Sequence, residues 1–395
     1  MNQSQMTVLM LVRSCLTGEP YTVPDDSDWE EIVGIGRKFH VSVMLSQGIR
    51  VSKATITSEI MKLLQLDALQ ELRIGRSQQE ELKAIFTALE AEGVDHLPLK
   101  GTTFRYLYPK PEYRYMSDAD VLIRPEQYPA IERVMTAMGY SFLADTEHEL
   151  TWVKNGRLKI EFHKRTVDPR YVGQWKYFGD GFSIASNKDG EHRFVWNAET
   201  DMLYAVAHMA KHFALEGGIL RNLIDLYYLR RRVTDEDAYR RGLRTMDLEK
   251  FADIAQTAVS DWMEGREMTS KSGQLFEMSL SDGLLEERSR QILMAIDRQE
   301  RGSESKFRTV LRKMFPPLKK MKNQYPTLRR MPFLLPFFWI GRLFGTVLFR
   351  RDRIRKNVDA SFGSESERKA QAFAEELEEF GLAGLLGGGA PEGQD

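Results

Sequence analysis

The first ninety residues of the chain carry apolar side chains at helical intervals. Between residues 60 and 89, leucine and isoleucine recur every three or four positions among Glu, Gln, Lys and Arg, a spacing that gives a helix one apolar face. Gly93 follows this stretch, and glycine commonly ends a helix. Nearer the N-terminus, Gly34 and Gly36 interrupt a similar pattern. We therefore predict an N-terminal helical segment over residues 1–92.

The period of the pattern changes after residue 93, where short apolar runs are bounded by turn or charged residues, as in buried strands. Asn155-Gly156 separates two such runs and is a strong sign of a β-hairpin. The predicted elements are strands at 94–99 and 119–123, helices at 104–108 and 125–138, and a hairpin of 150–153 with 158–162. Residues 170–196 predict a further hairpin or a loop. This is a small mixed sheet over 93–197.

Helical spacing returns after this sheet, and we predict an all-helical domain over 198–300. Together with the N-terminal helical segment and the mixed sheet, it makes the fold class α+β. The composition agrees with a globular chain, since 42% of the 395 residues are hydrophobic and 29% are charged. These values argue against wholesale disorder and against a protein with many membrane spans. Cys15 is the single cysteine, which excludes an internal disulfide framework and fits a reducing compartment.

The net charge of −1 hides an uneven distribution. Residues 301–357 contain 16 Lys and Arg against two acidic residues, whereas residues 358–395 contain nine acidic residues against two basic ones. We predict a basic, Pro-rich, amphipathic segment, followed by an acidic, Gly-rich tail that is partly disordered. We recognise no signal peptide, and we expect a cytoplasmic protein.

The basic stretch 306–357 includes a mostly apolar run, 333–349, that Pro336 and Arg342 interrupt. Such a run is a poor membrane-spanning helix. Two interpretations are equally favoured: the segment docks onto the helical domain, or it binds the inner face of an anionic membrane through its basic residues. Binding of nucleic acid, the other common polyanion, ranks third.

The strand predicted at 119–123 carries the sharpest chemical pattern, Ser117-Asp118-Ala119-Asp120. Alternate residues of a strand share a face, so Asp118 and Asp120 point the same way. On the next hairpin, Glu161 lies on the face opposite the apolar side chains and supplies a third carboxylate. Three carboxylates on neighbouring strands suit Mg²⁺ or Mn²⁺. They are the ligands that a two-metal phosphoryl or nucleotidyl transferase needs.

A second pattern follows the strand at 94–99. Lys100, Gly101 and Thr102 stand between that strand and a helical run, and a glycine there lets backbone N–H groups approach a phosphate. Arg114, four residues before Asp118, is a candidate phosphate clamp. Each pattern alone is weak, since acidic pairs on strands are often solvated and Lys-Gly pairs are common. Their order along the chain is what favours a joint site.

The helical half adds His208, Lys211 and His212. The two histidines are four residues apart and so share a helix face, as do Arg221 and Asp225, which we expect to pair. The His-Glu-x-x-His pattern of zinc enzymes is absent. One interpretation is that this helix simply packs by hydrogen bonds on the sheet; the alternative depends on the family resemblance described next. His163, on the same strand face as Glu161, is a candidate for orienting a metal ligand or acting as a base.

These motifs, taken together, resemble an uncharacterised bacterial nucleotidyltransferase family of the DNA polymerase beta-like superfamily. The resemblance covers about residues 30–260 and is carried by Leu99-Lys100-Gly101, Leu107-Tyr108-Pro109, Arg114, Asp118-Ala119-Asp120 and Ile160-Glu161-Phe162-His163. It implies a nucleotidyltransferase fold with Asp118, Asp120 and Glu161 as the metal ligands. It also implies that the helix with His208, Lys211 and His212 closes over the site, where these side chains contact phosphate or the acceptor. The wider superfamily usually has Gly-Ser or Gly-Gly where Gly101-Thr102 stands.

The expected activity is transfer of a nucleoside monophosphate from an NTP to an acceptor hydroxyl or phosphate, with release of pyrophosphate, in the presence of Mg²⁺ or Mn²⁺. The acceptor is a small molecule, a sugar or a peptide. Two alternatives stay open, because a fold and a metal site do not fix the acceptor. One is a tailoring enzyme of a peptide or polysaccharide pathway. The other is a non-catalytic nucleotide-binding or antitoxin-like module.

Overall fold

The computed structural model describes residues 1–154, 158–215, 219–280, 372 and 374–385. The chain forms two compact units, one of Met1–Glu286 with Glu379–Asp395 and one of Glu287–Glu378. The elements discussed below belong to the first unit. The predicted basic segment 301–357 and most of the acidic tail lie outside the described residues, as does the hairpin turn at Asn155-Gly156.

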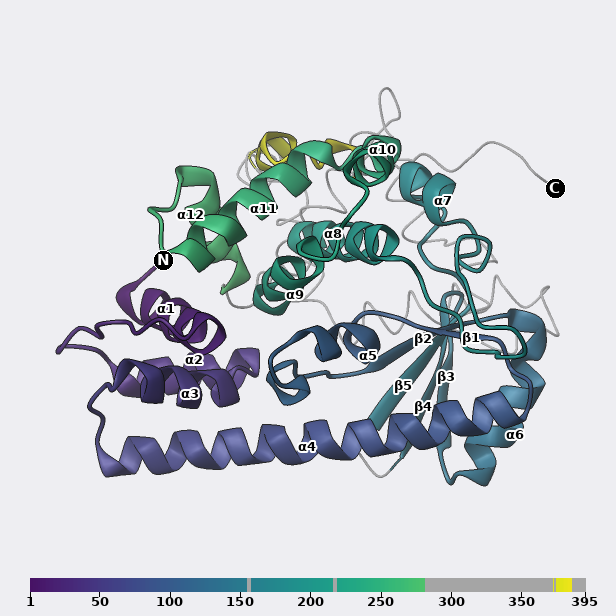
Figure 1. Ribbon diagram of the computed structural model, residues 1–395, viewed down its shortest axis with the longest axis horizontal. Coiled ribbons are helices and arrows are strands. Elements are labelled where there is room, and N and C mark those ends of the chain that lie inside the picture. The colour runs from purple at the N-terminus through teal and green to yellow at the C-terminus, as the bar shows by residue number, and fades with distance from the viewer. Residues whose placement is uncertain (155–157, 216–218, 281–371, 373, 386–395) are drawn as a thin grey trace, which may run out of the picture. The chain divides into compact units, whose positions relative to one another are not determined.

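A five-stranded mixed sheet lies at the centre of the described fold, in the strand order β1-β2-β5-β4-β3 (Figure 1). Strands β2 and β5 run parallel, and the other neighbouring pairs are antiparallel. The strands are β1 His96–Pro98, β2 Ala119–Ile123, β3 Ser141–Asp145, β4 Glu149–Lys154 and β5 Leu158–His163. The predicted α+β class with a small mixed sheet is confirmed.

Strand β3 was not predicted. It forms the edge of the sheet, and its side chains are mostly exposed. An edge strand that buries little on either face does not show the alternation of apolar and polar residues that identifies a half-buried strand. Phe142 of this strand packs edge-on against Trp152 of β4, with ring centroids 5.3 Å apart.

One face of the sheet packs against helix α4 (Ser58–Ala91) and helix α6 (Tyr128–Ala137), which lie together on that side (Figure 1). Alternate residues of each strand point into this core. Its members include Leu82, Ile85 and Leu89 of α4, Ile131 and Met135 of α6, Val121 and Ile123 of β2, Leu150 and Trp152 of β4, and Ile160 and Phe162 of β5. Each such side chain, when fully buried, contributes roughly 1.5–3 kcal/mol. The polar residues between them therefore point to the opposite face.

The N-terminal helical segment consists of α1 (Gln3–Thr17), α2 (Trp29–Phe39), α3 (Ser42–Ser52) and α4. Helix α2 continues through Gly34 and Gly36, so the expected interruption there is wrong. A β-carbon on Gly36 would lie 2.3 Å from a methyl group of Leu45. Its absence lets α2 and α3 approach closely, so this glycine serves helix packing rather than helix termination.

The helices after the sheet are α7 (Val172–Phe178), α8 (Ala198–Leu215), α9 (Leu220–Arg230), α10 (Glu236–Met246), α11 (Glu249–Glu264) and α12 (Ser270–Ser279). The predicted helical region after residue 198 is confirmed as far as residue 280; its last part, 281–300, lies outside the described residues. Residues 170–196 contain both helix α7 and an antiparallel bridge between Ser186 and Val195. Helices α8 to α11 lie on the side of the sheet away from α4 (Figure 1), which places them over the polar face.

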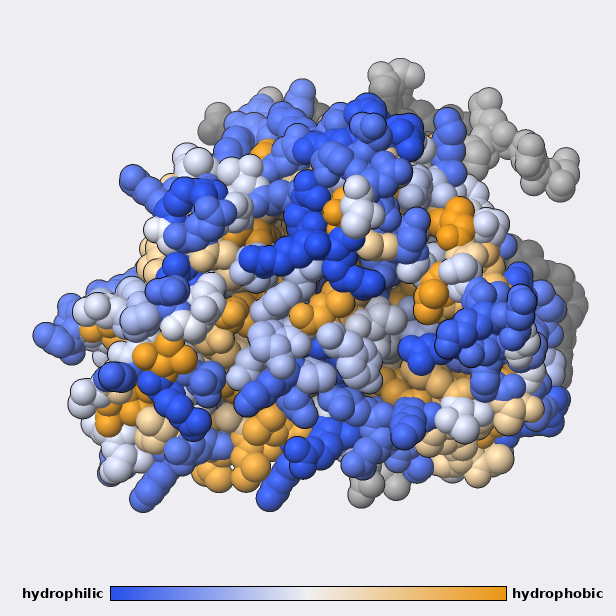
Figure 2. Space-filling model, viewed as in Figure 1, coloured by the Kyte–Doolittle hydropathy of each residue, from blue (hydrophilic) through white to orange (hydrophobic). Residues whose placement is uncertain are grey.

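Hydrophilic residues cover most of the face seen in Figure 2, with apolar residues in separate patches. Leu63, Leu66 and Leu69 of α4 are among the exposed apolar side chains. Within the ranges that the structure describes, none of the helices has the length and apolarity needed to cross a membrane. The apolar run at 333–349 lies outside those ranges.

Candidate active site

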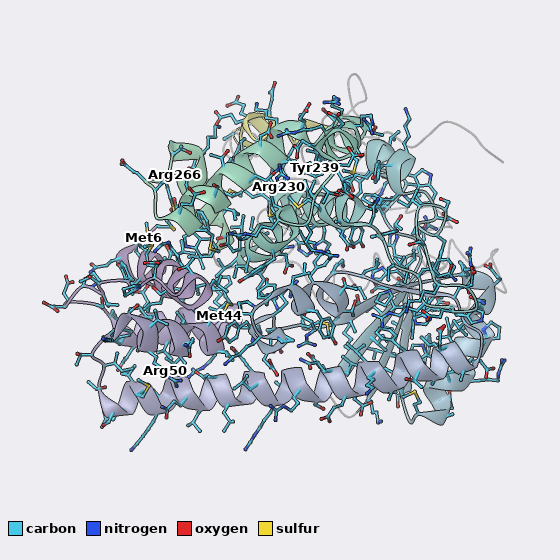
Figure 3. The ribbon with its side chains drawn as sticks, in the orientation of Figure 1. Met6, Met44, Arg50, Arg230, Tyr239 and Arg266 are labelled. Carbon is cyan, nitrogen blue, oxygen red and sulfur yellow. The ribbon has the colours of Figure 1, made fainter. Side chains whose placement is uncertain are left out.

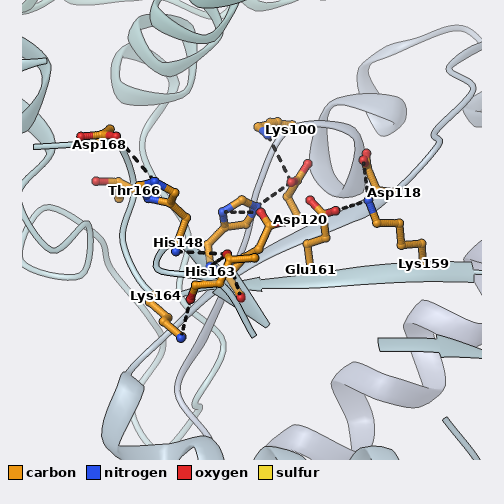
Figure 4. A network of polar contacts seen from close by, with 12 residues as sticks. Lys100, Asp118, Asp120, His148, Lys159, Glu161, His163, Lys164, Thr166 and Asp168 are labelled. Carbon is orange, nitrogen blue, oxygen red and sulfur yellow. Dashed lines mark hydrogen bonds and ion pairs between the residues drawn. The ribbon is translucent and has the colours of Figure 1, made fainter. Parts of the chain in front are cut away.

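The polar face of the sheet brings acidic residues together at the two parallel strands. In the register of β2 and β5, Asp120 lies opposite Glu161, and Leu122 lies opposite His163. On the other side of β5, Glu149 of β4 lies opposite His163. Because opposite residues of paired strands share a face, Asp120, Glu161 and His163 all point away from the apolar core, as Figure 4 shows.

Asp120 is almost fully buried, with 5% of its surface exposed. Two side chains, Lys100 and His163, contact its carboxylate. The ammonium of Lys100 lies 3.1 Å from Oδ1, and Nε2 of His163 lies 2.7 Å from the same oxygen. Burial alone raises the pKa of a carboxyl group, but the charge of Lys100 and the bond to His163 outweigh it and hold the pKa of Asp120 well below its usual range. Asp120 is therefore ionised at neutral pH.

Glu161 and Asp118 share one lysine. The ammonium of Lys159 is bonded to Glu161 and lies 3.9 Å from Oδ2 of Asp118. Burial raises the pKa of Glu161, Lys159 lowers it, and the charges of Asp118, Glu149 and Asp120 raise it further, so the net shift is upward. A carboxylate among other carboxylates is stabilised by a cation, and this cluster therefore has the electrostatics of a cation site.

The predicted metal ligands are only partly brought together. Asp120, Glu161 and His163 each offer one ligand atom, and these atoms lie within 4.8 Å of one another. Asp118 lies just before the first residue of β2, with its side chain 36% exposed, and is outside this group. Carboxylates with water suit Mg²⁺ and Mn²⁺, whereas imidazole is a more usual ligand of Zn²⁺ and other transition-metal ions. The donor set thus fits a divalent cation, with His163 beside the two buried acids.

The Lys-Gly segment stands where the sequence placed it, between β1 and the short helix α5 (Gly101–Phe104). Lys100 has φ +48° and ψ −121°, a conformation that side chains with a β-carbon rarely adopt. The hydroxyl of Thr102 donates to the carbonyl of Leu99, so it serves the fold of the turn. A β-carbon on Gly101 would lie 3.1 Å from Met116, and the glycine allows this close packing.

Arg114, the predicted phosphate clamp, forms a buried ion pair with Asp225. Its Nε and Nη2 donate to the two carboxylate oxygens of Asp225 on α9, each over 2.8 Å, and Nη1 donates to the carbonyl of Tyr115 over 2.7 Å. The hydroxyl of Tyr108 also donates to Asp225, over 2.7 Å. The expected pairing of Asp225 with Arg221 is wrong, because Arg114 occupies both oxygens. A phosphate contact by Arg114 stays a prediction.

The predicted face of α8 lies close to Lys100. Burial lowers the pKa of His208 well below its ordinary value, and the charge of Lys100 lowers it further, so His208 is neutral. Its Nδ1 accepts from the amide of Asn222 over 3.2 Å, and its Nε2 lies 2.9 Å from Nε2 of His212. With Nδ1 accepting, Nε2 carries the proton and donates it to His212. Lys211 is exposed.

Lys159 was not identified from the sequence as part of the site, although it lies between two acidic groups and alternates with Glu161 along β5. Asp225 and Arg221 were predicted to share a helix face, but their contacts were not predicted. Asp225 anchors α9 to the loop before Asp118, and Arg221 contacts that same loop. Both partners are more than a hundred positions away and leave no local signal.

Residues 25–264 match a family described as uncharacterised nucleotidyltransferase. Neither the curated proteins nor the solved structures include a match to the chain. The matched range contains the five strands, the Lys-Gly segment and helices α8 and α9.

Proposed function

Because the chain belongs to this family of uncharacterised nucleotidyltransferases, we propose that it transfers a nucleoside monophosphate from an NTP to an acceptor hydroxyl or phosphate. An acceptor oxygen forms a bond to the α-phosphorus, and the bond from that phosphorus to the bridging oxygen breaks, releasing pyrophosphate. The observation that carries this proposal is the placement of Asp120 opposite Glu161 on parallel strands. Family membership by itself supports a general role in nucleotidyl transfer.

We propose Asp118, Asp120 and Glu161 as the ligands of Mg²⁺ or Mn²⁺, with His163 next to them. A bound divalent ion lowers the pKa of the attacking hydroxyl and neutralises the leaving pyrophosphate. Lys100 keeps Asp120 ionised and therefore ready to bind a cation. Asp118 is outside the buried group but is half-exposed, which leaves its side chain room to turn towards Glu161.

The remaining predicted residues are proposed to bind substrate. Lys100, Gly101 and Thr102 border Asp120 on one side, where a nucleotide phosphate would lie. His208 and His212 approach from α8, and Lys211 adds a cation there; these three are proposed for the acceptor or the phosphates. We also propose that the protein is cytoplasmic and that its fold is that of the DNA polymerase beta-like superfamily.

Pyrophosphate release tests the proposal directly. The full chain is incubated with Mg²⁺, each of the four NTPs and candidate acceptors, and Asp118→Asn, Asp120→Asn and Glu161→Gln are compared with Glu132→Gln, an exposed acid on α6. We expect the site variants to lose turnover and the control to keep it. Urea unfolding verifies the fold, since Asp120→Asn leaves Lys100 buried without its partner.

The same experiment separates the proposal from its alternatives. Mass spectrometry of each acceptor names the group that is added, so a phosphate or sugar instead of a nucleotide would indicate the tailoring chemistry. Tight binding of NTP with Mg²⁺ but no product would indicate a non-catalytic module. Full turnover in all three site variants would contradict the proposed site.

A further inference from the structure

Arg221, in the first turn of α9, contacts the loop that leads to Asp118. Its Nη1 donates to the carbonyl of Tyr115 over 3.0 Å, and its guanidinium carbon lies 5.6 Å from the centre of the Tyr115 ring. Tyr115 is three residues before Asp118. Arg221 therefore stands at the same border of the site as one of the proposed metal ligands, on an element that is remote in sequence.

The guanidinium of Arg221 is poorly compensated. Within the described part of the chain it makes this single hydrogen bond, and no carboxylate lies within ion-pair distance of it. A guanidinium has five N–H donors, so several remain for a ligand. The neighbouring carboxylate, Asp225, is already bonded through both oxygens to Arg114. Two guanidinium groups thus share the neighbourhood of one carboxylate.

This imbalance affects the charge of Arg221. Burial, and then the positive charge of Arg114, lower the pKa of Arg221 to about 10, against weaker opposite effects of Asp225, Tyr108 and Asp118. A half-buried cation without an ion-pair partner is unfavourable, and an anion bound beside it removes the penalty. Other cations at the site differ in this respect: Lys100 is paired with Asp120, and Lys159 with Glu161.

We infer, on the basis of the proposed function, that Arg221 binds the triphosphate chain of the NTP, while Arg114 acts as a positioning residue through Asp225. The planar fork of a guanidinium matches two phosphate oxygens. The ion pair between Arg114 and Asp225 fixes α9 against the loop at Tyr115 and so sets the position of Arg221. The assignment gives the phosphate-clamp role to a residue of the helical half instead of to Arg114.

Calorimetric binding of three probes tests this assignment: sodium tripolyphosphate, NTP with Mg²⁺, and the matching nucleoside. Arg221→Gln should weaken the first two by about ten- to a hundredfold, the loss expected for hydrogen bonds to a charged group, and leave nucleoside binding unchanged. The matched control is Arg230→Gln. Arg230 lies on the same helix, is paired with Glu236 and is next to Tyr239 (Figure 3), and its loss should change none of the three affinities.

Each outcome decides between explanations. Wild-type affinity of Arg221→Gln for tripolyphosphate and NTP overturns the inference, as does an equal loss for the nucleoside, which would mean a structural role. If Arg221→Gln does not fold, Arg221→Met, which keeps the stem packed on Tyr115, is judged by the same criteria. Absence of NTP and tripolyphosphate binding by the wild-type protein would instead contradict the proposed function itself.

Discussion

The carboxylate of Asp225 receives two hydrogen bonds of 2.8 Å from the guanidinium of Arg114, a residue 111 positions earlier in the chain. Both side chains are buried. Burial lowers the pKa of an arginine, but the charge of Asp225 outweighs this effect and holds the pKa of Arg114 above its usual value. This pair joins helix α9 to the loop that precedes β2, so it links the helical half of the protein to the five-stranded sheet.

Breaking this pair on one side should destabilise the protein strongly. Asp225→Asn leaves the guanidinium of Arg114 buried without a counter-charge, and we expect the free energy of unfolding to fall by about 3–5 kcal/mol. Urea unfolding measures it. Glu236→Gln, which removes the partner of Arg230 from an exposed pair, is the control and should cost less than about 1 kcal/mol. Equal losses in the two variants would contradict this account.

Lys159 should compete with a metal ion. Its ammonium lies between Asp118 and Glu161, two of the proposed ligands. We expect Lys159→Met to bind Mn²⁺ up to about fivefold more tightly, because an ion pair whose lysine is 42% exposed is screened by water and contributes roughly 1 kcal/mol or less. Isothermal titration with Mn²⁺ measures the change, and Lys164→Met, at the pair with Asp145, is the control. Weaker Mn²⁺ binding would mean that Lys159 organises the carboxylates rather than occupying their site.

Glu71 should make stability depend on pH. It accepts hydrogen bonds from the backbone N–H groups of Ser42 and Val43 at the start of α3, and burial raises its pKa from 4.5 to about 7. The folded state thus holds the proton more tightly than the unfolded state. This stabilisation is fully present below pH 4.5 and is lost as the pH rises towards 7, by at most about 3 kcal/mol.

Unfolding by urea between pH 4 and pH 8 checks the expectation. Glu71→Gln keeps a carbonyl acceptor for the N–H groups of α3 but does not titrate, so its stability should fall less over this range than that of the wild-type protein. Glu80→Gln, an exposed position on the same helix, should follow the wild-type profile. A wild-type profile in Glu71→Gln would show that another group titrates.

Gly48 of α3 and Gly34 of α2 allow a matched test of how closely the N-terminal helices pack. A β-carbon on Gly48 of α3 would lie 2.0 Å from the backbone carbonyl oxygen of Leu11, whereas nothing lies within 4 Å of one on Gly34 of α2. Gly48→Ala should therefore force α1 and α3 apart and cost about 1–3 kcal/mol or more. Gly34→Ala should instead add about 0.5–1 kcal/mol. Thermal unfolding measures both, and a stable Gly48→Ala would disprove the close contact.

The sequence predicts the structure correctly where the spacing of apolar residues along one strand or helix determines it. Alternation along 119–123 and 158–162 places Asp120 and Glu161 on the face opposite Val121 and Phe162, as the structure has them. The fold class and the helical half follow from the same kind of periodicity. These features depend on the local geometry of strands and helices, which repeats every two or 3.6 residues.

Features that depend on long-range pairing could not be read from the sequence. No local pattern says that β2 pairs with β5 as well as with its chain neighbour β1, or that Arg114 pairs with Asp225. The pairing of Asp225 with Arg221, at helical spacing, was a reasonable expectation, but a bidentate partner from the loop replaced it. Strand β3 was not predicted because its side chains are mostly exposed, so its sequence lacks the alternation of apolar and polar residues that identifies a strand.

Lys100 carries a conflict between two demands on one position. Its backbone, at φ +48°, is one that glycine adopts freely, and a residue with a β-carbon costs about 1–3 kcal/mol there. Glycine would relieve that cost but would leave the buried carboxylate of Asp120 without the ammonium that faces it. Breaking one side of a buried ion pair costs about 3–5 kcal/mol, which exceeds the backbone strain. Selection for heat resistance alone would therefore retain lysine at residue 100, so the strained backbone persists because of the charge that it positions beside Asp120.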